Sequence, residues 1–317
     1  MHIGFVYRHT SKLGNSTLLV KFVPLLYDSV IQVSILFKTI SNSLETLYGK
    51  AEANSLARIV FKEKLGISRA DMAMNPNRLI SKIDEENILR ICKKLSEGYP
   101  IQQVMGYADF YGLRFKVNKY TLIPRPETEE LVQWIIEENR NKKGLKILDI
   151  GTGSGCIAIL LGKELNIPEI RAIDISSKAL KMAIKNAEEN SVHADFSRLD
   201  ILKKDNWDKL DQFDIIVSNP PYVTEKEKTA MHINVLEHDP HSALFVPDKD
   251  PLLFYEAISE MARTHLTPNG KLYFEINEAY GEDIKIMLES KGYSDVIVRK
   301  DLNGKDRMAG GLCKTYV

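Results

Sequence analysis

Apolar residues recur at three- and four-residue intervals through residues 36–100, which is the spacing of one buried helix face. Gly66 and Asn75-Pro76 interrupt the pattern, and Gly98-Tyr99-Pro100 ends it. The pattern predicts a small domain of helices separated by turns. The apolar positions that define it are Leu44, Leu47, Leu56, Ile59, Val60, Ile83, Ile88, Leu89, Ile91 and Leu95.

A different pattern occupies residues 101–123, where aromatic and aliphatic residues partly alternate with glycines and polar residues. This alternation predicts a β-hairpin linker. Two prolines then flank Arg125 and favour an extended loop, because proline fixes its own φ and restricts the residue before it. We expect a helix to begin near Glu127.

From residue 145 onward, apolar runs of strand length alternate with stretches of helix length. Such alternation is typical of a parallel sheet with helices on both faces. We therefore expect an α/β domain over residues 124–317. The predicted strands cover 145–150, 170–175, 195–200, 213–218, 271–276 and 295–300, and the predicted helices cover 154–165, 176–190, 251–266 and 279–291.

Residues 1–35 fit neither pattern. Residues 17–37 are the most apolar stretch near the start and follow two basic residues, as in a secretory signal. A lysine, a proline and an aspartate interrupt the stretch, however, and no small-residue cleavage site follows. A charge near the centre of a membrane span costs about 2.5–3.5 kcal/mol. We expect residues 1–35 to be an N-terminal extension of uncertain structure that leads into a helix.

Charge and cysteine content narrow the class of protein. The 317 residues contain 43 Lys and Arg and 43 Asp and Glu, so the net charge is near zero. Proteins that bind nucleic acid through its phosphates usually show a basic excess or a basic tract, and the sequence shows neither. Cys92, Cys156 and Cys313 are odd in number and far apart, which argues against a disulfide framework and favours a reducing cytoplasm.

A glycine-rich turn, Gly151-Thr152-Gly153-Ser154-Gly155, follows the first predicted strand and opens a helix. Glycines allow a ligand to approach the main chain closely, and N–H groups at a helix start favour an anionic group. If the dinucleotide fingerprint G-x-G-x-x-G is counted from Gly151, its third glycine position is occupied by Cys156, so the motif does not match. Counted from Gly153, the motif matches only in its variant form, with Ala158 at the third position. The spacing D-x-G-x-G-x-G resembles instead the first motif of class I methyltransferases, in which the loop wraps the methionine end of S-adenosylmethionine.

Acidic residues follow the next two predicted strands. Asp174 lies about 20 residues past the glycines, where an ionised carboxylate can accept hydrogen bonds from two ribose hydroxyls. By the same logic, Asp200 is placed to reach an adenine amino group. Ile201 is a candidate for packing on the adenine face, and Trp207 is its rival.

The sequence Asn219-Pro220-Pro221-Tyr222 follows the fourth predicted strand. Ligands of open parallel sheets bind at the carboxyl ends of strands, so this loop should face the same crevice as the glycine-rich turn. The prolines fix the backbone and leave the Pro220 carbonyl free to accept a hydrogen bond. Asn219 adds a side-chain acceptor, and Tyr222 adds an aromatic face.

These groups suit an NH2 group whose lone pair is delocalised. Hydrogen bonds from its two N–H groups to Asn219 Oδ1 and to the Pro220 carbonyl would orient the nitrogen beside a methyl sulfonium, which is already a strong electrophile. Positioning alone can supply several kcal/mol of the barrier. We expect Asn219, Pro220 and Tyr222 to be catalytic, and Asn219, Pro220, Pro221 and Tyr222 to bind the substrate.

Three histidines, His232, His238 and His241, lie near Glu237 and Asp239. Their spacing matches no specific metal-binding motif, and this kind of methyl transfer needs no metal. We expect a solvated loop and no metal site.

Taken together, these segments resemble the HemK/PrmC family, the N5-glutamine methyltransferases of peptide chain release factors. The resemblance covers residues 40–317. Asn-Pro-Pro-Tyr alone is shared with DNA adenine and some RNA guanine methyltransferases, and the helical domain with the Pro-Arg-Pro-Glu-Thr loop narrows the assignment. The matching segments are Leu122–Glu129, Leu148–Ala158, Asn219–Tyr222, Phe254-Tyr255, Phe274–Ile276 and Asp301–Arg307.

The resemblance implies an α/β fold of the class I S-adenosylmethionine-dependent methyltransferases, Rossmann-like with a seven-stranded sheet and a small helical N-terminal domain that helps hold the substrate. It implies methyl transfer to N5 of the glutamine in the Gly-Gly-Gln motif of release factors, with no direct nucleic-acid or membrane partner. Together with the positions of Asp200 and Ile201, it assigns cofactor binding to Gly151, Thr152, Gly153, Ser154, Gly155, Asp174, Asp200, Ile201 and Asn219.

Two other functions remain as alternatives. A nucleic-acid amino methyltransferase, acting on N6 of adenine or N2 of guanine, should carry a basic cleft or a target-recognition domain, and the sequence shows neither. A non-enzymatic binding protein on the same scaffold would be expected to lose Asn219 or the glycines, which are intact.

Overall fold

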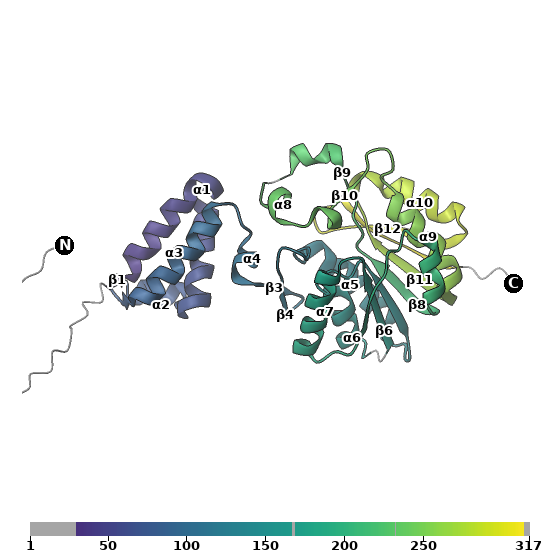
Figure 1. Cartoon of the computed structure of the whole chain (residues 1–317), viewed down its shortest axis with the longest axis horizontal. Helices are drawn as coiled ribbons and strands as arrows, with labels where there is room; N and C mark the ends of the chain where they lie inside the picture. The colour runs from purple at the N-terminus through teal and green to yellow at the C-terminus, as the bar shows by residue number, and fades with distance from the viewer. Residues whose placement is uncertain (1–29, 167–168, 232, 314–317) are drawn as a thin grey trace, which may run out of the picture.

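The computed structural model describes residues 30–166, 169–231 and 233–313. A helical domain and an α/β domain lie apart and are joined by a short helix and a hairpin (Figure 1). Of the expected extension, residues 1–29 lie outside the described residues.

The helical domain is built around a long helix that bends at Gly49. Its elements are β1 (Ile31–Gln32), α1 (Val33–Leu65), α2 (Arg69–Met74), β2 (Leu79–Ile80) and α3 (Lys82–Ser96). Gly49 has φ 72° and ψ 162° inside α1, a conformation that glycine tolerates and that breaks the helical path. The apolar faces of α1 and α3 share a core that includes Ile40 and Ile88. The expected start of this domain at residue 36 falls inside α1. The strand β1, which pairs with β2, lies still earlier in the chain than α1.

The linker contains the predicted hairpin, preceded by a short helix that the sequence pattern does not predict. Its elements are α4 (Ile101–Met105), β3 (Tyr107–Phe110) and β4 (Leu113–Lys116). The main chain of Lys116 exchanges hydrogen bonds with the Asn186 side chain, at 2.7 and 2.9 Å. These bonds attach the hairpin to a helix of the α/β domain.

A seven-stranded sheet forms the centre of the α/β domain. Its strands are β5 (Lys146–Ile150), β6 (Glu169–Asp174), β7 (Asp195–Arg198), β8 (Phe213–Ser218), β11 (Leu266–Glu275), β12 (Tyr293–Lys300) and β13 (Asp306–Cys313). They lie in the order β12-β13-β11-β8-β5-β6-β7. The strands from β11 to β7 are parallel, whereas β13 runs antiparallel to β11 and β12.

The strand β13 is an antiparallel member of the otherwise parallel sheet at this edge. No strand is predicted there, because Gly310 and Gly311 have little intrinsic preference for strands. A Cβ added at Gly310 would lie 2.9 Å from Cη2 of Trp134, so close packing excludes a larger residue. The other strands correspond to predicted ones, and β8 has the predicted ends.

Helices cover both faces of the sheet. They are α5 (Pro126–Asn139), α6 (Cys156–Glu164), α7 (Ser177–Asn190), α9 (Leu253–His265) and α10 (Gly281–Ser290). Neighbouring strand residues face opposite cores, as strand geometry requires. Ile147 and Ile215 pack with α5 and α6, whereas Leu148 and Ile216 pack with α9 and α10. Within the described residues, no helix is long and apolar enough to cross a membrane.

Short elements fill the connections of the α/β domain. They are η1 (Lys204–Lys209), β9 (Val223–Thr224), η2 (Glu225–Ala230), α8 (Ile233–His238), η3 (His241–Ala243), β10 (Phe245–Val246) and η4 (Glu278–Tyr280). The segment around α8 lies beside the linker (Figure 1). Gln103 Nε2 donates to the His238 carbonyl at 2.8 Å, and the Tyr99 and His238 rings stack with centroids 4.0 Å apart.

Candidate active site

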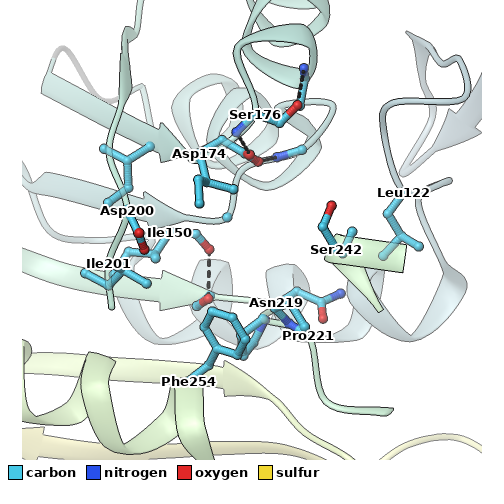
Figure 2. Close-up of a pocket in the computed structure, with 18 of the residues that line it drawn as sticks. Leu122, Ile150, Asp174, Ser176, Asp200, Ile201, Asn219, Pro221, Ser242 and Phe254 are labelled. Carbon is cyan, nitrogen blue, oxygen red and sulfur yellow. Dashed lines mark hydrogen bonds between the residues drawn. The ribbon is translucent and has the colours of Figure 1, made fainter. Parts of the chain in front are cut away.

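A cavity of about 280 Å³ opens at the carboxyl ends of β5, β6 and β8 (Figure 2). The turn after β5 and the loop after β8 both contribute to its wall, so the two predicted loops meet at one rim of the sheet. The predicted site residues that line it are Gly151, Gly153, Asp174, Asp200, Ile201, Asn219, Pro220 and Pro221.

The glycine-rich turn depends on left-handed backbone and on close packing. Gly151, Gly153 and Gly155 have φ values of 74°, 57° and 82°, which residues with a Cβ rarely adopt. A Cβ at Gly155 would lie 2.9 Å from Ile159 Cδ1 and 3.1 Å from the Cβ of Ala183. A Cβ at Gly151 would lie 3.9 Å from the Asn219 carbonyl oxygen, so the turn passes beside the loop after β8.

Other residues of the turn that we expect to bind the cofactor do not line the cavity. Thr152 Oγ1 donates to Asp149 Oδ2 at 2.7 Å, and the Ser154 carbonyl accepts a 2.9 Å bond from Asn186 Nδ2. The side chains of Thr152 and Ser154 are buried, and Gly155 is the N-cap of α6. These residues hold the turn in shape from behind, while the first two glycines face the cavity.

Asp174 lies where β6 ends and is held by main-chain donors. Its Oδ2 accepts a 2.9 Å bond from the Gly153 N–H, and its Oδ1 accepts a 2.8 Å bond from the Ser176 N–H. Burial raises the pKa of Asp174, whereas these N–H groups favour the ionised form. A carboxylate oxygen can accept a second hydrogen bond, so Asp174 keeps acceptor capacity toward the cavity.

Of the two residues considered for packing on the adenine, Ile201 and Trp207, the cavity wall contains Ile201. Asp200 and Ile201 both line the cavity. Trp207 does not line it, and its indole Nε1 donates to the Ile201 carbonyl at 2.9 Å. The indole therefore supports the Ile201 main chain from outside the wall.

Asn219 projects from the loop after β8 toward the side of the cavity bordered by Leu122 and Ser242 (Figure 2). Its Nδ2 donates to Thr128 Oγ1 at 3.2 Å. That bond directs the NH2 of the amide toward α5, which leaves Oδ1 as the group that can accept a hydrogen bond from a ligand.

Tyr222, which we expect to contact the substrate, lies behind the wall of this cavity. It does not line the cavity, its hydroxyl donates to Glu275 Oε1 at 2.9 Å, and its ring packs on the core beneath α9 and α10. Burial and the neighbouring carboxylate raise the pKa of the hydroxyl well above its ordinary value. Tyr222 therefore supports the cavity wall from behind, and its hydrogen bond places Glu275 next to the site.

Sequence reasoning missed part of the wall. Tyr120, Leu122, Pro240, Ser242 and Phe254 also line the cavity. Leu122 and Phe254 lie in segments that carry the family resemblance, and that resemblance could have identified them as residues of the site. Tyr120 and Pro240 lie in irregular segments and Ser242 lies in η3, and the local sequence at these positions has no pattern that marks a wall.

The histidine-rich segment holds no metal-binding cluster among the residues that the structure describes. His238 stacks on Tyr99, and His241 Nε2 lies 2.8 Å from the Leu236 carbonyl oxygen. His232 lies outside the described residues.

Two family models match the chain. Residues 128–244 match the model described as "Methyltransferase small domain", and residues 36–106 match the "PrmC N-terminal domain". The first match contains the glycine-rich turn and the Asn-Pro-Pro-Tyr loop. The second covers the helical domain from residue 36 onward, together with α4.

Relatives are similar over nearly their whole length. A release factor glutamine methyltransferase from Bacteroides thetaiotaomicron is 47% identical, and the alignment covers 85% of this chain and 96% of that protein. Those from Flavobacterium psychrophilum and Lactococcus lactis are 46% and 42% identical, covering 84% and 73% of this chain and 94% and 85% of theirs. With both sequence motifs meeting in one cavity and identity at this level, the chain belongs to the release factor glutamine methyltransferase family.

Proposed function

We propose that this protein transfers a methyl group from S-adenosylmethionine to the N5 amide nitrogen of the glutamine in the Gly-Gly-Gln motif of peptide chain release factors. The observation that carries the proposal is the meeting of Gly151 and Asn219 in the wall of one cavity. The relatives' shared name describes the same reaction and substrate class.

The residues present fit S-adenosylmethionine. Gly151 and Gly153 leave space beside the main chain for its methionine end, and Asp174 offers carboxylate oxygens to its ribose. Asp200 and Ile201 offer an acceptor and an apolar surface to its adenine. When bound, this group supplies an electrophilic methyl on a sulfonium, and the described lining, with two carboxylates and no lysine or arginine, suits a cation.

The loop after β8 supplies the other half of the site. Asn219 Oδ1 and the Pro220 carbonyl accept hydrogen bonds from the two N–H groups of the glutamine amide, which aims the nitrogen at the methyl group. Pro221 forms the wall beside them. An amide nitrogen is a weak nucleophile, so orientation is the main contribution that these residues make to the rate. The nitrogen loses a proton when the methyl group is attached.

The helical domain is suited to hold the release factor. Met74, Leu79 and Ile83 have exposed fractions of 69%, 57% and 72%, so this domain presents apolar side chains on its surface. Apolar side chains on a surface can contribute to contact with a protein partner where they lie together. A partner that acts in translation places the reaction in the cytoplasm.

Labelled S-adenosylmethionine and a purified release factor provide the test. We expect label on the release factor, and none on a variant in which the glutamine of Gly-Gly-Gln is replaced by alanine. Label that persists on the alanine variant would refute the proposed acceptor. Label that appears only on added DNA or RNA would support a nucleic-acid amino methyltransferase instead.

A further inference from the structure

A buried chain of hydrogen bonds connects Asn219 to Glu275. Asn219 Nδ2 donates to Thr128 Oγ1 at 3.2 Å, and Thr128 Oγ1 donates to Glu275 Oε2 at 2.6 Å. Thr128 and Glu275 are 3% and 1% exposed, so water does not compete for these bonds. The three residues come from the loop after β8, the first turn of α5 and the last position of β11.

The chemistry of these three groups fixes which one donates and which one accepts in each hydrogen bond. An ionised carboxylate only accepts hydrogen bonds, so Glu275 requires the Thr128 hydroxyl to donate its single hydrogen. The Thr128 oxygen is then left with lone pairs alone and can only accept from Asn219. The Asn219 amide must therefore place its NH2 toward Thr128 and its Oδ1 on the opposite side.

Tyr222 completes the arrangement from the other side of Glu275. Its hydroxyl donates to Glu275 Oε1 at 2.9 Å, so a donor satisfies each carboxylate oxygen. Burial raises the pKa of Glu275, whereas the hydrogen bonds from Thr128 and Tyr222 and the positive charge of Arg307 favour its ionised form. The carboxylate is thereby stabilised as an acceptor in a place where an unpaired charge would be costly.

We infer that Thr128 and Glu275 are positioning residues that orient the Asn219 amide so that its oxygen faces the substrate. This inference rests on the proposed function, in which Asn219 Oδ1 accepts a hydrogen bond from the glutamine NH2. The two orientations of an asparagine amide have the same shape, and only their hydrogen-bond partners distinguish them. A reversed amide would present N–H donors to the N–H donors of the substrate, and no hydrogen bond would form.

The test compares Thr128→Val, which keeps the shape but removes the hydroxyl, with Thr128→Ser, which keeps the hydroxyl. We expect Thr128→Val to lower kcat about 10- to 100-fold while leaving the KM for S-adenosylmethionine within about twofold. Thr128→Ser should restore kcat to within about threefold of wild type. A wild-type kcat in Thr128→Val, or an equal loss in Thr128→Ser, would overturn the inference.

Two further variants separate positioning from folding. Glu275→Gln keeps the size of the side chain but replaces one accepting oxygen with an NH2 donor, so Thr128 and Tyr222 can no longer both donate to it. We expect kcat to fall about tenfold, and this test does not depend on the stability of Thr128→Val. Unchanged kcat in Glu275→Gln would count against the inference. Thr224→Val is the matched control, because Thr224 is also buried and donates to a carboxylate, that of Glu227, at 2.7 Å, without contacting Asn219. Its kcat should change by less than about twofold.

A spectroscopic measurement distinguishes failure of the inference from failure of the proposed function. The side-chain NH2 signal of Asn219, assigned by its loss in Asn219→Ala, should exchange slowly with solvent in wild type and in Thr128→Ser. It should exchange faster in Thr128→Val and Glu275→Gln. A wild-type protein that leaves the release factor unmethylated would refute the function, whereas equal exchange in all four proteins would refute the hydrogen-bond chain.

Discussion

Ser218 Oγ donates a 2.7 Å hydrogen bond to the Ile150 carbonyl, and this buried bond joins the last residues of β8 and β5. The glycine-rich turn begins directly after Ile150, and the Asn-Pro-Pro-Tyr loop begins directly after Ser218. Ile150 and Ser218 are also partners in the pairing of β5 with β8, so the side-chain bond reinforces the contact between the two strands where each loop leaves the sheet. This contact joins the turn that we propose to bind the cofactor to the loop that we propose to bind the substrate.

Ser218→Ala should destabilise the protein and misplace the two loops. The Ile150 carbonyl would lose a donor in a dry environment, which costs about 1–3 kcal/mol of the free energy of unfolding. Urea unfolding measures that loss, and steady-state kinetics should show a lower kcat/KM. A variant as stable as wild type would mean that another donor replaces the serine hydroxyl.

Asn219→Ala should abolish most methyl transfer while leaving cofactor binding largely intact. The substitution removes the acceptor that we propose to orient the substrate nitrogen, and loss of one preorganised hydrogen-bonding group of this kind costs about 100-fold or more in kcat. Single-turnover assays report the methyl transfer, and calorimetry reports the Kd for S-adenosylmethionine. Turnover at the wild-type rate would contradict the role given to Asn219.

Gly155→Ala should disrupt the turn through both conformation and packing. Position 155 has φ 82°, and the new Cβ would lie 2.9 Å from Ile159 Cδ1. Gly144→Ala is the matched control, because Gly144 has φ 66° and nothing within 4 Å of the added Cβ. The control should cost about 1–2 kcal/mol from the left-handed backbone alone. Gly155→Ala should cost more and weaken cofactor binding, and equal losses in both variants would show that the close packing has no effect.

Asp149→Asn should flatten the pH dependence of stability. Asp149 is 1% exposed, and burial raises its pKa to about 7 from an ordinary 3.8. Between these values the folded protein holds a proton that the unfolded chain releases, so the free energy of unfolding falls as the pH rises toward 7. This group contributes a slope of at most about 1.4 kcal/mol per pH unit. Denaturation from pH 4 to 8 should show wild type losing stability relative to the variant, and parallel curves would contradict the raised pKa.

Arg125→Ala should loosen the cavity wall and destabilise the fold. Arg125 Nη2 lies 2.5 Å from Asp239 Oδ2, and the Asp239 side chain is fully buried next to Pro240, which lines the cavity. Loss of the guanidinium leaves that carboxylate without its cation, which costs about 1–3 kcal/mol, limited by the partial exposure of Arg125. The cost should be smaller at low pH, where Asp239 can take up a proton. A double-mutant cycle with Asp239→Ala isolates the pair, and additive losses would show that the two residues are not coupled.

Much of the fold could be predicted from periodicity. The strand at 213–218 has the predicted ends because an apolar run of strand length ends at a proline pair, and both the burial and the stop signal are local. The strand β13 could not be predicted in this way. Gly310 is there because Trp134, far away in the chain, packs against it, and Gly311 lies close to Tyr293 and Val296 of β12.

In the candidate site, too, some features could be predicted from local sequence and others depend on tertiary packing. The sequence by itself determined the element types, the glycine-rich turn and the loop of Asn219, because spacing and backbone restrictions act between neighbours in the chain. Only the tertiary structure decided that Ile201 and not Trp207 lines the cavity, that Tyr222 lies behind it, and that Thr128 and Glu275 orient Asn219. Those relations join residues more than ninety positions apart in the case of Thr128 and Asn219, and they depend on how α5 and β11 pack around the strand ends. Packing between segments that are far apart in the chain cannot be predicted from local sequence.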